Sequence, residues 1–161
     1  MSIGVGDSFP SGTFLLKDHE GVKHISTEEY FKSKKVVLFA LPGAFTPTCS
    51  AKHLPGFLTY ASAFKEKKVD EIVCLSVNDP FVMKAWCDAN KAGNDILFLA
   101  DGNASLSKAM GLTFDGSMYS LGVRSQRFAM ILTGLKVEKL FVEKPGVFDV
   151  SSAQKVLGHL S

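Results

Sequence analysis

An uninterrupted apolar run that leads into a helix-period segment limits what this chain can fold into more than any other feature. Residues 36–40 read Val-Val-Leu-Phe-Ala, a composition typical of a strand buried on both faces of a sheet. The segment beyond it carries apolar residues at the helical period, at Leu54, Phe57, Leu58, Ala61 and Phe64. The sequence therefore predicts a central strand joined by a short turn to an amphipathic helix.

Other segments carry the patterns of further strands. They are expected at these apolar runs, the last two as a β-hairpin around Gly134: 72–77, 96–100, 128–132 and 137–142. Residues 1–25 mix glycine, proline and short apolar stretches, so we expect irregular structure with small strands there. Residues 113–125 are rich in glycine and serine and are interpreted as a loop.

Helix boundaries are marked by capping residues. Ser26 and Glu29 form a capping-box pattern, which predicts a short helix over residues 26–31. Asp79 and Pro80 supply a polar cap and a proline at the first helical position. The helix after Pro80 is expected to present one apolar face made of Phe81, Val82, Ala85, Trp86 and Ala89.

Three more helices complete the expected order of elements. They are placed over 46–67 with a kink at Pro55, over 105–110 with Gly111 as its stop, and after a cap at Ser151. Strands that alternate with helices and end in a hairpin predict an α/β fold, in which helices flank a mixed central sheet. The length of 161 residues favours a single domain over 1–161.

A cysteine stands at the junction between the central strand and its helix. Cys49 lies about one turn into the expected helix, where backbone N–H groups lack partners and the helix dipole is positive. That environment favours the thiolate, which is the reactive form of cysteine. Free cysteines are commonly buried structural residues, but the polar neighbours Thr46, Thr48 and Ser50 offer hydrogen bonds to a thiolate. The junction is therefore interpreted as a redox or nucleophile site.

The residues around Cys49 resemble the active site of peroxiredoxins. Pro42, Thr46 and Cys49 fit the family's Pro-x-x-x-Thr-x-x-Cys motif, and residues 42–57 are similar to the type II, peroxiredoxin-five-like subfamily. Two later segments, 74–79 and 124–128, also match that subfamily, and the likeness runs from about Val5 to Leu160. The resemblance implies a thioredoxin-like fold and thiol-dependent reduction of hydrogen peroxide and small alkyl hydroperoxides. It implies a cysteine sulfenic acid intermediate and no metal or organic cofactor.

The resemblance also implies catalytic roles for individual residues. Cys49 is the expected nucleophile, and the donors aimed at the charge on the peroxide are Thr46, Arg127 and the backbone N–H groups of Thr48 and Cys49. A guanidinium stays charged and presents several donors, which suits Arg127 to both the thiolate and the peroxide. Pro42 has no N–H, so it can pack over the thiolate without offering a competing donor.

Two further residues are expected at the substrate site. His53 lies four residues after Cys49, on the same side of the expected helix, and is interpreted as a residue that tunes the thiolate. Arg124 lies three residues before Arg127 and is assigned to substrate binding because it belongs to the same matching segment.

The other cysteines decide how Cys49 is regenerated. Cys74 lies in an apolar strand, where cysteine is more often inert, but some type II peroxiredoxins have a proposed resolving cysteine at this position. Others use a cysteine near the carboxyl terminus, and residues 148–152 contain none here. The expected cycle is therefore a one-cysteine cycle with glutathione and glutaredoxin, or thioredoxin, as reductant, and Cys74 stays open as a resolving residue. Cys87 is interpreted as structural.

Two other classes of function stay open on the sequence alone. A cysteine–histidine hydrolase would use Cys49 and His53, but it needs an orienting third residue and an oxyanion hole that nothing marks. A redox sensor or interaction protein without turnover would use the same scaffold. Consumption of peroxide with a thiol donor separates the peroxidase from both.

Composition limits partners and location. The chain has 18 Lys+Arg against 16 Asp+Glu, a net charge of +2 that is too balanced to indicate nucleic-acid binding. No run approaches the roughly 18 apolar residues of a membrane span, and residues 1–10 lack the features of a signal peptide. Cysteines number 3 and do not form a disulfide framework, so a cytoplasmic location is expected. A homodimer is implied by the resemblance, through the face that carries Phe45 and Phe81.

Overall fold

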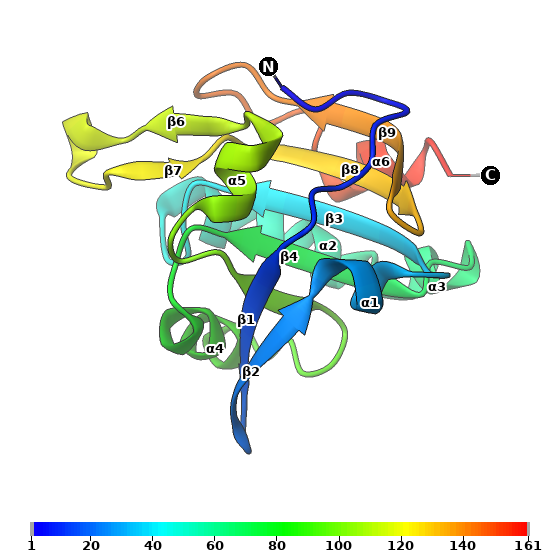
Figure 1. Ribbon diagram of the computed structural model, residues 1–161, viewed down its shortest axis with the longest axis horizontal. Coiled ribbons are helices and arrows are strands. Elements are labelled where there is room, and N and C mark those ends of the chain that lie inside the picture. Colours follow the sequence, from blue (N-terminus) through cyan, green and yellow to red (C-terminus); the bar gives the residue numbers. More distant parts are fainter. Residues whose placement is uncertain (1, 161) are drawn as a thin grey trace.

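A seven-stranded mixed sheet organises the computed structural model, which describes residues 2–160 (Figure 1). The strand order is β2-β1-β5-β4-β3-β8-β9. β3, β4 and β5 are parallel, whereas β1 pairs antiparallel with β5 and β8 pairs antiparallel with β3. The bounds are β1 Thr13–Asp18, β2 Gly21–Ser26, β3 Lys35–Leu41, β4 Glu71–Ser76, β5 Leu97–Ala100, β8 Phe128–Thr133 and β9 Lys136–Val142. The prediction of a mixed central sheet is confirmed.

Helices cover both faces of the sheet, as predicted. Four of them, α2 (Leu54–Thr59), α3 (Ala61–Glu66), α4 (Pro80–Ala89) and α6 (Ala153–Leu157), pack on one face. α1 (Thr27–Phe31) and α5 (Ser105–Met110) pack on the other, in front of the sheet in Figure 1. The arrangement is the thioredoxin-like fold that the sequence resemblance implied.

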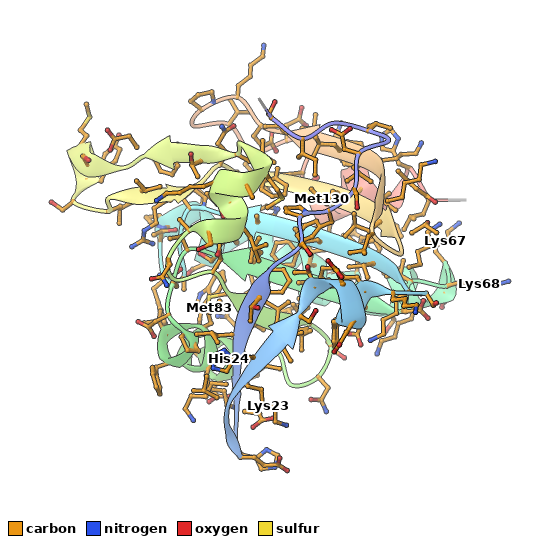
Figure 2. All side chains as sticks on the ribbon, in the orientation of Figure 1. Lys23, His24, Lys67, Lys68, Met83 and Met130 are labelled. Carbon is orange, nitrogen blue, oxygen red and sulfur yellow. The ribbon has the colours of Figure 1, made fainter. Side chains whose placement is uncertain are left out.

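β3 explains why residues 36–40 are apolar without interruption. Successive side chains of a strand point to opposite faces. Val37 and Phe39 therefore join the core under α2, whereas Val36 and Leu38 join the core under α1 and α5, and all four are fully buried. The two cores also contain Met83 of α4 and Met130 of β8, respectively, while Figure 2 shows lysines such as Lys23 and Lys68 projecting from the rim.

The capping predictions are confirmed except at the last helix. Ser26 Oγ accepts from the Glu29 amide at 3.4 Å, and Asp79 Oδ1 accepts from the Val82 amide at 2.8 Å. Gly111 ends α5 with a φ of 70°, a left-handed conformation that glycine adopts without strain. The cap of α6 is Ser152 rather than Ser151. Ser152 Oγ accepts from the Lys155 amide, whereas Ser151 Oγ donates to Glu143.

The apolar face expected for α4 is wrong in part. Met83 and Trp86 face the core, whereas Phe81 is 61% exposed and Ala85 and Ala89 are also exposed. α4 is apolar around most of its circumference, so two overlapping stripes fit the helical period. Packing against β1 and β5 selects the stripe that contains Met83 and Trp86.

The loop expected over 113–125 is replaced by a small antiparallel sheet. β6 (Thr113–Asp115) and β7 (Val123–Ser125) pair around a short 3₁₀ helix, η2 (Ser117–Tyr119). The glycines that indicated a loop close this unit, since the Gly116 amide donates to the Gly122 carbonyl at 2.7 Å. Each strand is too short to carry a readable alternation.

Candidate active site

The strand topology brings Cys49 and Arg127 to one edge of the sheet. The chain leaves the carboxyl end of β3 and reaches Cys49 after a short turn. β8 runs antiparallel to β3 with Phe128 opposite Ala40, so Arg127, the residue before β8, stands at the same end. The carboxyl edge of parallel strands is where open α/β sheets place their ligand sites.

Hydrogen bonds join Cys49, Arg127, His53 and Ser151 into one chain. Arg127 Nη2 donates to Cys49 Sγ at 3.3 Å, and Arg127 Nη1 lies 2.8 Å from His53 Nδ1. His53 Nε2 lies 3.0 Å from the carbonyl oxygen of Ser151. Cys49 and His53 are both fully buried, with 0% of their surfaces exposed. A single guanidinium thus contacts sulfur and imidazole at once, which its planar fork of donors allows.

These contacts fix the protonation of His53. Arginine has no acceptor, so Nδ1 must accept from the guanidinium, and Nε2 carries the proton that it donates to Ser151. Burial and the positive charge of Arg127 lower the pKa of His53 to about 3, although the bond to the Ser151 carbonyl acts in the opposite direction. His53 is therefore neutral at pH 7, and the positive charge beside Cys49 belongs to Arg127.

The same contacts argue against a cysteine–histidine hydrolase. A base that activates Cys49 would need a free ring nitrogen directed at Sγ. Both nitrogens of His53 are engaged, one with Arg127 and one with Ser151. His53 therefore orients Arg127 instead of taking a proton from Cys49.

The helix that carries Cys49 contains a π-helical turn near its start. In η1 (Cys49–His53) the Leu54 amide donates to the Cys49 carbonyl, a wider turn than in an α-helix. Pro55 follows, and because it has no N–H it cannot donate to the carbonyl of Ala51. A second break at Tyr60 separates α2 from α3. In place of a kink at Pro55, the segment expected as one helix over 46–67 has a wide turn just before Pro55 and a break at Tyr60. The wide turn places Cys49 and His53 within reach of the same guanidinium.

Two side chains fix the turn between β3 and Cys49. Thr46 Oγ1 donates to the Gly43 carbonyl at 2.6 Å, and Arg124 Nη1 donates to the Pro42 carbonyl at 3.1 Å. Arg124 Nε also donates to the Leu121 carbonyl, so this guanidinium ties the turn to the β6–β7 unit. A Cβ at Gly43 would meet Arg124 Nη1, so a larger residue there would displace this guanidinium from the Pro42 carbonyl.

The geometry changes the role assigned to Thr46. Its hydroxyl proton is directed at Gly43, so with this bond intact Thr46 meets a peroxide as an acceptor and not as the donor that the sequence suggests. The oxygen lone pairs remain free to accept a hydrogen bond from a peroxide. Thr48 is half-buried and makes no capping bond with its side chain. Its amide lies in the first turn, where N–H groups have no intrahelical acceptor.

Cys74 lies apart from this edge, in the middle of β4. It pairs with Phe39 and Phe98 on the neighbouring strands and is fully buried. Burial first, and then the nearby Cys49 and Cys87, raise the pKa of the Cys74 thiol well above its ordinary value. Cys87 is half-buried, and burial likewise raises the pKa of its thiol. All three cysteines are free thiols.

Sequence reasoning missed several residues that support the site. Asn78, expected only beside a helix cap, accepts from the Ala44 amide at 2.9 Å and so holds the turn before Cys49. The ring of Phe148 packs edge-on against His53, with centroids 5.1 Å apart, and lies 5.8 Å from the Arg127 guanidinium. Trp86 Nε1 donates to Ser50 Oγ at 3.0 Å. Only Asn78 carried a local signal, since it follows a buried strand at the carboxyl edge.

Neither a membrane span nor a metal cluster is found in the part of the chain that the structure describes. Among residues 2–160, no helix is long and apolar enough to cross a membrane. Within the same residues, no group of three or more His, Cys, Asp or Glu side chains is arranged to hold a metal ion.

Comparisons with known proteins place this site in a family. The Redoxin family model matches residues 4–157. Peroxiredoxin-2B of Arabidopsis thaliana is 48% identical over 156 residues, which cover 96% of each protein. Reduced Prx3 of Vibrio vulnificus, solved in complex with H₂O₂, is 49% identical with a TM-score of 0.95 over 99% of both chains. The antioxidant protein of Plasmodium falciparum, a 1-Cys peroxiredoxin, is 32% identical with a TM-score of 0.90 over 96% of both chains.

The chain therefore belongs to the Redoxin family and is a peroxiredoxin, a thiol-dependent peroxidase. Enzymes of this family act on peroxides and take electrons from thiol reductants such as thioredoxin. Within the family, its relatives are peroxiredoxins of the Prx2/Prx5 type, the group that includes the plant type II enzymes. The resemblance indicated by residues 42–57 and 124–128 is confirmed.

Proposed function

We propose that this peroxiredoxin reduces hydrogen peroxide and small alkyl hydroperoxides at Cys49 through a sulfenic acid. The observation that carries the proposal is the contact of 3.3 Å between Arg127 Nη2 and the buried Cys49 Sγ. A fixed positive charge beside sulfur favours the thiolate and stabilises the negative charge that develops on the leaving oxygen. Reduced Prx3 of Vibrio vulnificus, a relative over nearly its whole length, was solved in complex with H₂O₂.

The proposed reaction uses the described side chains and no cofactor. The Cys49 thiolate attacks one peroxide oxygen, an S–O bond forms, and the O–O bond breaks. Sulfur is oxidised to sulfenic acid, and the leaving oxygen takes a proton to become water or an alcohol. Arg127 and the Thr48 and Cys49 amides donate hydrogen bonds to the peroxide oxygens, while Thr46 Oγ1 accepts a hydrogen bond from the peroxide O–H. Pro42 shields the sulfur, and Arg124 holds the Pro42 carbonyl in place.

For regeneration we propose a one-cysteine cycle. A thiolate of glutathione or glutaredoxin attacks the sulfenic acid, water leaves, and a second thiol releases Cys49 from the mixed disulfide. Cys74 is a poor resolving residue because it is fully buried in a central strand and its raised pKa keeps it protonated. Thioredoxin is the alternative reductant.

The cycle is tested by replacing Cys74 with alanine, which leaves no unpaired hydroxyl in the apolar core. We expect turnover with glutathione and glutaredoxin to stay within about twofold of the original protein, because the external thiol needs only Cys49. Mass spectrometry of the peroxide-treated protein should find glutathione on Cys49. Cys87→Ala is the matched control, since Cys87 is the other free cysteine. A dominant Cys49–Cys74 disulfide and loss of turnover in Cys74→Ala would contradict the one-cysteine cycle.

We also propose that two copies associate through the edge that carries the site. Phe45 and Phe81 are 56% and 61% exposed, and Met118 and Tyr119 of η2 are 87% and 73% exposed. Phe45 lies beside α4, with its ring centroid 6.5 Å from that of Trp86, and β7 is tied to the Pro42 turn through Arg124. Exposed apolar side chains gathered in this way mark interaction surfaces.

Light scattering tests this association. We expect a homodimer at micromolar concentration and a monomer for Phe81→Asp, because a charge in an apolar interface is costly to desolvate. Val22→Asp is the matched control, since Val22 is exposed on β2 in the separate hairpin. A monomeric original protein, or a dimer that survives Phe81→Asp, would count against this surface.

A cytoplasmic location and a single domain over 1–161 remain predictions.

A further inference from the structure

A buried carboxylate lies behind the site, and the reaction above does not use it. Glu143 follows β9 and is 7% exposed. Its amide donates to the Arg127 carbonyl at 3.0 Å, so its backbone is bonded directly to the backbone of the arginine that contacts Cys49. A buried charge is retained only where hydrogen bonds or other charges compensate it.

Three donors from one loop supply that compensation. Glu143 Oε2 accepts from the Asp149 amide at 2.6 Å, from the Ser151 amide at 2.9 Å and from Ser151 Oγ at 2.7 Å. Burial alone would raise the pKa of Glu143, but these bonds lower it below its ordinary value, so the carboxylate is ionised at neutral pH. The loop over 144–152 is thereby drawn against the end of β9.

The 144–152 loop contacts His53 on the side of the ring away from Arg127. The Ser151 carbonyl accepts from His53 Nε2, and the ring of Phe148 packs against the imidazole. The bond to Ser151 keeps the proton on Nε2, which leaves the Nδ1 lone pair for Arg127. Glu143 therefore acts on Arg127 from both sides, through the backbone of Arg127 and through Ser151 and His53.

We propose that Glu143 is a positioning residue for peroxide reduction, which holds the 144–152 loop so that His53 aims the Arg127 guanidinium at Cys49. The inference rests on the proposed function, because it assumes that Cys49 is the reacting group. All three bonds end on a single oxygen, Oε2. The side chain must therefore reach this one position, and the oxygen of a glutamine amide, at the same reach, can accept from two of the three donors there.

Two conservative variants separate reach from charge. Glu143→Gln keeps the reach and loses the charge, and we expect it to retain most of the rate constant for oxidation of Cys49 by hydrogen peroxide. Glu143→Asp keeps the charge and shortens the side chain, and we expect the rate constant to fall roughly tenfold, as for other residues that orient a site residue from behind. Glu138→Ala is the matched control: it removes a carboxylate from β9, the strand that precedes Glu143, where Glu138 is bonded to Thr133.

A double-mutant cycle separates positioning from general stability. If Glu143 acts through His53, then Glu143→Asp should cost little further rate in a His53→Gln background. Additive effects of the two changes, an unchanged rate in Glu143→Asp, or equal losses in the Asp and Gln variants would each overturn the inference. The original protein and Cys49→Ser are measured alongside. Oxidation that does not depend on Cys49 would instead overturn the proposed function.

Discussion

Replacing Cys49 with serine is expected to abolish peroxide reduction and to leave the fold intact. A hydroxyl at this position is isosteric with the thiol, and Cys49 is fully buried without a disulfide, so the packing of the helix onto β3 should be preserved. The hydroxyl of serine is a weak nucleophile without an activating base. His53 cannot serve as that base, since both of its nitrogens are engaged with Arg127 and Ser151. Peroxide consumption should therefore fall to the rate without enzyme.

The measurement is peroxide consumption with a thiol donor, together with circular dichroism and the thermal midpoint of unfolding. Cys87→Ser is the matched control, because it removes a half-buried thiol that lies away from Arg127. We expect that control to keep its activity. Substantial turnover by Cys49→Ser would remove Cys49 as the nucleophile. If Cys49→Ser loses turnover because it no longer folds, the measurement is repeated with Cys49→Ala.

The local part of the site could be predicted from the sequence because its signals are local. The apolar run of β3, the helical period beyond it and the polar neighbours of Cys49 all lie within one strand–turn–helix unit. Capping residues follow equally local rules, which is why the starts of α1 and α4 agree with the structure. Pro55 predicted an irregular helix for the same reason, and a π-helical turn directly precedes it.

Contacts between distant segments were beyond local reasoning. Arg127 reaches Cys49 only because β8 pairs with β3 in a particular antiparallel register. Without the family motif, an arginine at the start of a strand is expected to be exposed to solvent. The motif alone indicates the role of Arg127 in the site. The bond between His53 and Ser151 joins residues 98 positions apart, and Ser151 was interpreted as a helix cap. The bond from Thr46 to Gly43 has no local signal either, because the direction of a hydroxyl depends on the turn that surrounds it.

Short elements were the other source of error. β6 and β7 pair over three residues each, so neither carries a readable alternation, and their glycines were interpreted as loop residues. In α4, apolar residues around most of the helix left the buried stripe ambiguous until β1 and β5 selected it. In both cases tertiary packing decided between structures that the local sequence left equally acceptable.

Replacing Arg127 with alanine should slow the oxidation of Cys49 about 10²- to 10³-fold, the cost of removing one preorganised donor from a site that stabilises developing charge. Two contacts are lost together, the bond of 3.3 Å to Cys49 Sγ and the bond of 2.8 Å to His53 Nδ1. Without the guanidinium, the buried sulfur loses the full positive charge that contacts it and favours the thiolate. The thiolate fraction at neutral pH should fall as well.

Arg127→Lys divides this effect between charge and geometry. An ammonium keeps the positive charge but cannot present two parallel donors from one plane, so it should bond to either sulfur or His53 and not to both. We expect a rate constant between those of the original protein and Arg127→Ala. The thiolate fraction, followed by its ultraviolet absorbance or by alkylation with iodoacetamide, should recover more fully than the peroxide rate, because it depends on charge alone.

The comparison of the two readouts decides what the guanidinium does. If Arg127 only favoured the thiolate, the peroxide rate would fall in proportion to the thiolate fraction in both variants. If it also stabilises the leaving oxygen, the peroxide rate will fall further than the thiolate fraction, most clearly in Arg127→Lys. An unchanged peroxide rate and an unchanged thiolate fraction in Arg127→Ala would remove Arg127 from the site. The contact between Arg127 and Cys49 would then have only a structural role, in joining the start of β8 to the helix that carries Cys49.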